Sequence, residues 1–264
     1  MRDLERYLWL TVLAPILWLQ GRHVRRVTPR LPEPPGPREG TTGQGPLLRV
    51  LIAGDSAAAG VGAPSQEEAL CAKLVSRLSQ HCTVEWRVLA VNGLDSPGLL
   101  RLLEAAPLRR FDVVVLSIGV NDVTNLRSPS EWLKWQTRLA ATIEQRFEPK
   151  LLIHSALPPM HGFTALPHPL RWFLGRWAIE MNRQLAVSLV GQTLRALHVP
   201  FQGAGAHGLA ADGFHPGPMG YAMWAQGLSQ LILASPTVSA QSASLLNNKS
   251  SIHFAKFQPS GDKT

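Results

Sequence analysis

The chain has 264 residues, of which 45% are hydrophobic, and it carries a formal net charge of +8 at pH 7. That apolar content is enough for a sizeable core, which excludes a fully disordered chain and favours one globular domain with tails. Because the basic residues are scattered and form no stripe interleaved with aromatic residues, we expect no nucleic-acid partner and consider an anionic membrane surface the better explanation of the charge.

Residues 1–27 contain an apolar run followed by basic residues. The run from Tyr7 to Gln20 is shorter than the about 20 residues that a helix needs to cross a bilayer, and Pro15 interrupts it. Tryptophans within the run and arginines after it are typical of a helix in the membrane interface. We therefore expect residues 7–26 to associate with a membrane surface, with packing of this helix on the domain as the alternative. The arginines favour a bacterial-type inner membrane with the domain on its cytoplasmic side, although the side stays open.

Residues 28–47 are rich in proline and glycine, which is typical of an extended linker. Residues 48–235 alternate short apolar runs, predicted as strands, with longer amphipathic runs, predicted as helices. This alternation predicts an α/β domain in which helices cover both faces of a parallel sheet of about five strands. Residues 236–264, rich in Ser, Gln and Asn, are expected to form a disordered tail.

The predicted elements alternate along the whole domain. Strands are expected at 49–54, 83–91, 111–119, 150–157 and in the short run VPFQ at 199–202. Helices are expected at 67–81, 96–106, 129–147, 171–197 and 218–235. The proline- and aromatic-rich segment 154–177 is too long for a simple connection, and we expect it either to shape a substrate site or to pack against the body of the domain.

Suggestive residues follow several of these strands at the edge where an open α/β sheet binds its ligands. They fall in four blocks, which are Gly54-Asp55-Ser56, Gly93, Gly119 to Asp122, and Asp212 to Pro216. Taken alone, each block has an ordinary explanation as a cap or a turn. Ala58 occupies the place of the second glycine of a nucleophile elbow, and neither a phosphate loop nor a set of metal ligands at matching spacing is present.

Taken together and in this order, the four blocks resemble those of the SGNH (GDSL-type) hydrolases over about residues 49–234. The resemblance implies the three-layer αβα, flavodoxin-like fold of that family. Ala57 stands where the GDSL name has leucine, which leaves the catalytic atoms untouched. Asp55 and Asp122 are expected only to stabilise turns and caps.

The resemblance also implies a role for each matched residue. Ser56 would be the nucleophile, His215 its general base, and Asp212 the acid that orients the imidazole. The oxyanion hole would consist of the backbone N–H groups of Ser56 and Gly93 and the side-chain amide of Asn121. This chemistry requires no metal and no organic cofactor.

The implied function is a serine hydrolase that cleaves carboxylic (acyl or acetyl) esters through an acyl-enzyme on Ser56, as esterases and lipases do. Its substrate would be a small-molecule or lipid ester. Two alternatives stay open, an acyltransferase that uses the same acyl-enzyme and a catalytically inactive, membrane-tethered binding protein of the same fold. A nucleotide-binding protein is disfavoured because no G-x-G-x-x-G motif follows the first strand.

Overall fold

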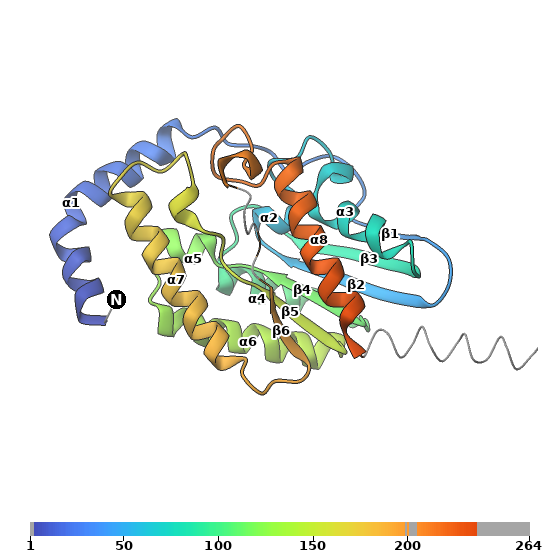
Figure 1. Cartoon of the computed structure of the whole chain (residues 1–264). Coiled ribbons are helices and arrows are strands. Elements are labelled where there is room, and N and C mark those ends of the chain that lie inside the picture. Colours follow the sequence, from blue (N-terminus) through green and yellow to red (C-terminus); the bar gives the residue numbers. More distant parts are fainter. Residues whose placement is uncertain (1–2, 199, 201–204, 237–264) are drawn as a thin grey trace, which may run out of the picture.

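The computed structural model describes residues 3–198, 200 and 205–236, and a six-stranded sheet in the order β1-β3-β2-β4-β5-β6 forms its centre (Figure 1). The strands β2 to β6 run parallel to one another, whereas β1 pairs antiparallel with β3 at one edge. This confirms the predicted α/β fold and its five parallel strands, while the antiparallel β1 makes the sheet a mixed one of six strands. The strands are β1 (Glu39–Thr42), β2 (Leu47–Gly54), β3 (Thr83–Ala90), β4 (Val113–Ser117), β5 (Leu151–Ser155) and β6 (Arg195–His198).

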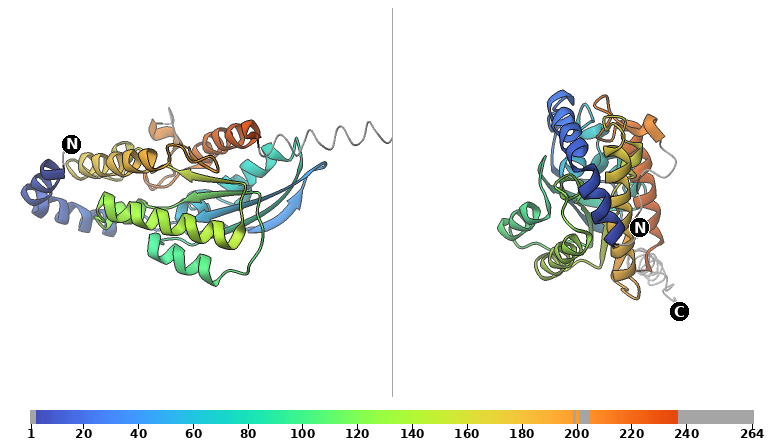
Figure 2. Two further views of the ribbon diagram at one scale, coloured as in Figure 1. Left: turned by 90° about the horizontal axis from the view of Figure 1, so that it is seen from below. Right: turned by 90° about the vertical axis from the view of Figure 1, so that its left-hand side faces the viewer.

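Helices cover both faces of the sheet, with α3 and α8 packed on one face and α4 and α6 on the other (Figure 2). The α-helices are α1 (Asp3–Val27), α2 (Ser56–Ala59), α3 (Leu70–Leu78), α4 (Ser96–Ala105), α5 (Val120–Thr124), α6 (Pro129–Phe147), α7 (Leu170–Ser188) and α8 (Pro218–Ala234). The described residues also form the 3-10 helices η1 (Gln66–Glu68), η2 (Met160–Gly162) and η3 (Gly205–Gly208).

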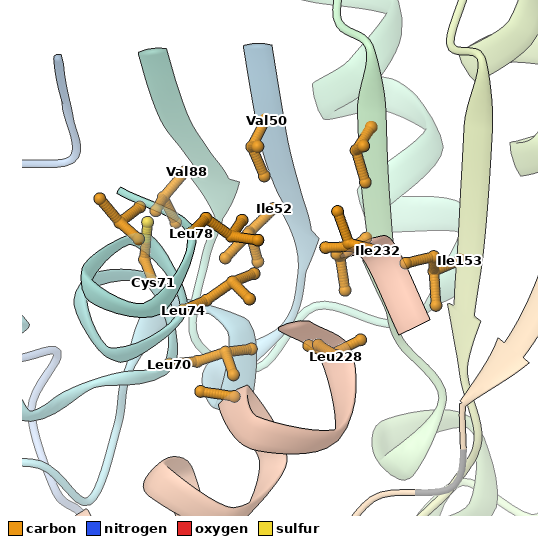
Figure 3. Packing of buried hydrophobic residues seen from close by; sticks show 14 of the residues in the cluster. Val50, Ile52, Leu70, Cys71, Leu74, Leu78, Val88, Ile153, Leu228 and Ile232 are labelled. Atoms are coloured by element: carbon orange, nitrogen blue, oxygen red, sulfur yellow. The ribbon is translucent and has the colours of Figure 1, made fainter. Parts of the chain in front are cut away.

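The alternation of side chains along β2 explains why both faces are covered. Val50 and Ile52 point to the face of α3 and α8, and Leu51 and Ala53 to the face of α4 and α6. All four are fully buried, and each large side chain among them contributes about 1.5–3 kcal/mol to folding. Figure 3 shows the first face, where β2 meets Leu70, Leu74 and Leu78 of α3 and Leu228 and Ile232 of α8.

The structure differs from the prediction at the end of the long helix expected at 171–197. Helix α7 ends at Ser188, Gly191 adopts a positive φ of 79°, and Arg195–His198 pairs with β5 as strand β6. Arginine, alanine and leucine favour a helix locally, so this prediction was wrong because pairing with β5 outweighs helix propensity. The strand expected at 199–202 falls on residues of which only Pro200 is described.

Strand β1 lies inside the segment 28–47, which composition assigns to a linker. It adds one strand to the sheet by pairing with β3, and its Gly40 lies against the ring of Trp86. A short edge strand needs little apolar character, so the composition of this segment does not predict a strand. The tail expected at 236–264 lies outside the described residues except for Pro236.

Helix α1 packs on α7. Leu17 and Val24 are buried in the hydrophobic cluster that α7 forms. Gln20 donates a hydrogen bond to the carbonyl of His168 (2.6 Å) and accepts one from the N–H of Leu170 (3.0 Å). Within the described residues, no helix combines the length and apolar character that crossing a bilayer requires.

We expect Gly54→Ala to destabilise the fold. A Cβ atom at position 54 would overlap the carbonyl oxygen of Ser117 on the neighbouring strand, so β2 and β4 would have to separate. Urea denaturation should show the free energy of unfolding falling by at least about 2 kcal/mol, within the usual cost of overpacking. Gly162→Ala is the control, because a Cβ there meets nothing within 4 Å. Equal losses in the two variants would contradict the packing argument.

Candidate active site

Ser56 follows β2 after the single residue Asp55, and it is the first residue of the short helix α2. The carboxylate of Asp55 accepts a hydrogen bond from the N–H of Ala57 (3.2 Å) and so caps this turn. The N–H of Asp55 donates to the carbonyl of Ser117 on β4 (3.1 Å), and Gly60 ends the turn with a φ of 92°. These contacts fix Ser56 at the carboxyl edge of the sheet.

Asp212 and His215 come from one tight loop before α8. Oδ1 of Asp212 accepts hydrogen bonds from the N–H groups of Phe214 and His215, both at 3.0 Å. Gly213 has a φ of 65°, a conformation that glycine adopts more readily than other residues. The first carboxylate oxygen therefore shapes the loop and leaves the second oxygen to face the imidazole.

The imidazole of His215 joins the two other side chains. Its Nδ1 lies 2.6 Å from Oδ2 of Asp212, and its Nε2 lies 3.0 Å from Oγ of Ser56. Burial on its own would raise the pKa of Asp212, but hydrogen bonds from the His215 ring and from the Phe214 and His215 backbone hold that pKa below its usual value. An ionised Asp212 only accepts, so Nδ1 carries the hydrogen and Nε2 is left to accept the proton of Ser56.

Gly93 and Asn121 lie in the segments that follow β3 and β4, the two neighbours of β2. The side-chain Nδ2 of Asn121 donates to the carbonyl of Leu94 (2.8 Å), which ties these two segments together. An amide nitrogen carries two hydrogens, so one stays available for a ligand. Gly93 is exposed and has a φ of 84°.

A buried ion pair and its hydrogen bonds connect the segment that follows β3 to the segment that follows β4. The carboxylate of Asp122, which is 0% exposed, lies 2.7 Å from Nε of Arg127 and accepts hydrogen bonds from the N–H and Oγ of Ser96 (3.1 and 2.9 Å). Burial raises the pKa of Asp122, and the hydrogen bonds from Ser96 and Arg127 act in the opposite direction. Arg127 also pairs with Asp95 at 3.3 Å. Arg127 could not be predicted as part of the site, because nothing in the residues around it shows that it reaches Asp95, far away in the chain.

A cavity of about 500 Å³ lies beside Ser56, over the carboxyl ends of β2, β4 and β5. Part of the segment 154–177 lines it, and the amide of Asn182 fixes that segment by bonding both the N–H and the carbonyl of Leu157 (2.8 and 2.9 Å). Gly93 and Asn121 are not among the described residues that line it. The helices also contribute Ile179, Asn182 and Trp224, which only the packing of α7 and α8 brings to the cavity.

A hydroxyl, an imidazole and a carboxylate joined by hydrogen bonds at the end of a parallel sheet are an arrangement found in several classes of hydrolase. In the described part of the chain, no group of three or more His, Cys, Asp or Glu side chains could hold a metal ion. The sequence model of the GDSL-like Lipase/Acylhydrolase family matches residues 52–223, and the chain belongs to that family. The protein is therefore a carboxylic ester hydrolase.

Solved structures share the fold at low sequence identity. A carbohydrate acetylesterase family member from Sinorhizobium meliloti is 18% identical, with a TM-score of 0.53 over 73% of this chain and 99% of its own. A lipolytic G-D-S-L family member from Veillonella parvula is 14% identical, with a TM-score of 0.54 over 71% and 99%. A carbohydrate esterase family 2 enzyme from Corynascus thermopiles is 16% identical, with a TM-score of 0.56 over 78% and 68%. No curated protein sequence matches the chain.

We expect Asp55→Asn to change how stability depends on pH. Burial raises the pKa of Asp55 to about 7, and the hydrogen bond from Ala57 and the charge of His215 oppose this only in part. The folded protein therefore binds this proton more tightly than the unfolded chain. The associated stability is fully present below the ordinary pKa of 3.8 and is lost as the pH rises through about 7.

Urea denaturation at about pH 5 and about pH 8 measures this effect, since the two values lie on either side of the raised pKa. Wild type should lose stability relative to Asp55→Asn between the lower and the higher pH. Identical pH profiles for the two proteins would contradict the assignment.

Proposed function

We propose that the protein is a serine esterase that hydrolyses carboxylic esters through an acyl-enzyme on Ser56. One observation carries the proposal, the continuous hydrogen-bonded line from Asp212 through His215 to Ser56, with distances of 2.6 and 3.0 Å. Residues far apart in the chain supply the nucleophile and its base, and both distances lie within the reach that proton transfer needs. Membership of an ester hydrolase family supports the same reaction.

In the first step, Oγ of Ser56 attacks the ester carbonyl carbon while Nε2 of His215 takes the hydroxyl proton. Asp212 stays ionised and stabilises the imidazolium that forms. When the tetrahedral intermediate collapses, the bond to the alcohol breaks and His215 gives its proton to the departing oxygen. Water then attacks the acyl-enzyme in the same way, releases the acid and restores the Ser56 hydroxyl.

The negative oxygen of the tetrahedral intermediate needs hydrogen-bond donors. We assign this role to the backbone N–H groups of Ser56 and Gly93 and to Nδ2 of Asn121. Two contacts support the assignment. The bond from Asn121 to Leu94 leaves a second amide hydrogen, and the hydrogen bonds from Ser96 to Asp122 fix the segment that follows Gly93.

We expect fluorophosphonate probes to label Ser56 and the label to disappear in Ser56→Ala, because only an activated serine attacks the phosphorus. Asn121→Ala should lower kcat by about 10²–10³ with little change in KM, as the loss of one oxyanion donor typically does. Asn125→Ala is the matched control, since Asn125 is exposed at the end of the same short helix. Labelling and mass spectrometry, together with hydrolysis of p-nitrophenyl acetate, measure both effects.

The labelling and hydrolysis experiments distinguish a serine esterase from an inactive binding protein and from an acyltransferase. Equal labelling of wild type and Ser56→Ala would contradict the proposal. Ester hydrolysis that survives in Ser56→Ala would contradict it as well. Product analysis with an added alcohol distinguishes a hydrolase from an acyltransferase, because a transferase passes most of the acyl group to the alcohol even in water.

We also propose that α1 docks this esterase on a membrane surface. Exposed apolar side chains lie at positions 8, 12, 16 and 19, a spacing that places them on one face of the helix. Arg22 lies over the ring of Trp18 at 5.0 Å, and Arg25 and Arg26 follow in the last turn. Apolar side chains bordered by tryptophan and arginine suit an anionic lipid interface. The cytoplasmic leaflet carries such lipids, and it is the side that we propose.

We expect Val12→Glu combined with Leu19→Glu to weaken binding to phosphatidylglycerol vesicles by at least about tenfold, because each substitution removes apolar burial in the interface. Co-sedimentation with vesicles measures the binding. Val187→Glu is the control, since Val187 is 62% exposed and Val12 is 61% exposed. Unchanged binding of the double variant, or no binding of wild type to these vesicles, would contradict the docking proposal.

A further inference from the structure

The cavity beside Ser56 has walls that the esterase reaction itself does not require. Its buried interior includes the apolar side chains of Ile118, Leu157, Phe163 and Trp224. Its rim includes Ile179 of α7, which is 51% exposed. Asn182, one of its polar lining residues, has both ends of its amide engaged with the backbone of Leu157.

The size of the cavity bears on the substrate. Its volume of about 500 Å³ falls within the range of about 300–1,000 Å³ of pockets that enclose whole ligands. An acetyl group has one methyl beyond its carbonyl and would leave most of this space empty, although protein interiors are otherwise closely packed. A sugar would bury most of its hydroxyl groups against apolar walls, because polar side chains such as Ser155 are a minority of the lining, and that burial is costly.

Resting on the proposed esterase function, we propose that this cavity binds the acyl chain of the substrate and that this chain is apolar and considerably longer than acetyl. The preferred substrate is thus a fatty acyl ester. The enzyme's preference for this acyl chain is determined by the segment that follows β5 and by Ile179 at the rim.

The burial of the two reacting residues indicates which half of the ester occupies the cavity. The acyl group stays bonded to Ser56, a buried residue of the cavity lining. The alcohol must leave past Nε2 of His215, whose side chain is 17% exposed, and water must enter by the same way. The acyl chain therefore takes the enclosed interior, and the alcohol lies toward solvent.

Hydrolysis of p-nitrophenyl acetate, butyrate and octanoate by the full chain tests the length preference. Each methylene that becomes buried should raise kcat/KM by about fourfold until the cavity is full. Ethyl octanoate and octyl acetate test the placement, because they are isomers that carry the long chain on opposite sides of the ester. Ethyl octanoate should be the better substrate by at least about tenfold.

Two variants connect the preference to the cavity. Ala156→Phe fills part of the interior, because Ala156 is buried and lines the cavity. It should lower kcat/KM for octanoate at least about tenfold relative to acetate. Ile179→Asp places a charge at the exposed rim and should act in the same direction even if the first variant fails to fold. Val187→Asp on the same helix is the control and should leave the ratio unchanged.

The outcomes separate this inference from the proposed function. If fluorophosphonate labels Ser56 but acetate is hydrolysed as well as octanoate, the acyl-chain assignment is wrong and the esterase function stands. A preference for octyl acetate over ethyl octanoate also overturns the assignment. Loss of labelling and of all ester hydrolysis in the folded wild type would instead overturn the esterase function itself.

Discussion

The register of the parallel strands is the constraint on which the site depends. Gly54 at the end of β2 pairs with Ala90 of β3 on one side and with Ser117 of β4 on the other. The three chain segments that follow these strands therefore leave the sheet side by side at its carboxyl end, and each carries part of the candidate site. Helix α8 packs on one face of this sheet and holds the fourth segment, the loop of His215, over the same edge.

Three buried carboxylates lie around this edge, and each is accommodated differently. Asp212 has an imidazole and two backbone N–H groups as partners, and its pKa is lowered despite its burial. Asp122 has the guanidinium of Arg127, which compensates part of the cost of burying its charge. Asp55 forms no ion pair with any described residue, and burial raises its pKa to about 7. The pKa values of similar side chains thus shift in different directions or to different extents because their partners differ.

Much of the fold could be predicted from the sequence because its strands and helices carry strong patterns. The helix at 129–147 has the predicted bounds, since a serine cap and a proline mark its start. Strand β6 could not be predicted, because its residues favour a helix and only β5 makes them a strand. Strand β1 was hidden for the opposite reason, since an edge strand carries little apolar pattern.

In the candidate site too, residues in local motifs could be predicted from the sequence, and residues brought in by distant packing could not. Short motifs point to Ser56, Asn121 and the pair Asp212 and His215, because each follows a predicted strand or precedes a predicted helix. The cavity could not be predicted, since Ile179 and Trp224 reach it only through the packing of two long helices. Arg127 escaped notice for a similar reason, as its partners at Asp95 and Asp122 lie in different segments.

The contact between α1 and α7 has a practical consequence for work with the purified enzyme. Composition places the start of the folded unit near residue 48, and a shortened protein would naturally begin there. Such a protein would lack Gln20, leaving the His168 carbonyl and the Leu170 N–H without this partner. It would also bare the part of the α7 cluster that Leu17 and Val24 cover, and the exposed surface would favour self-association and poor yields.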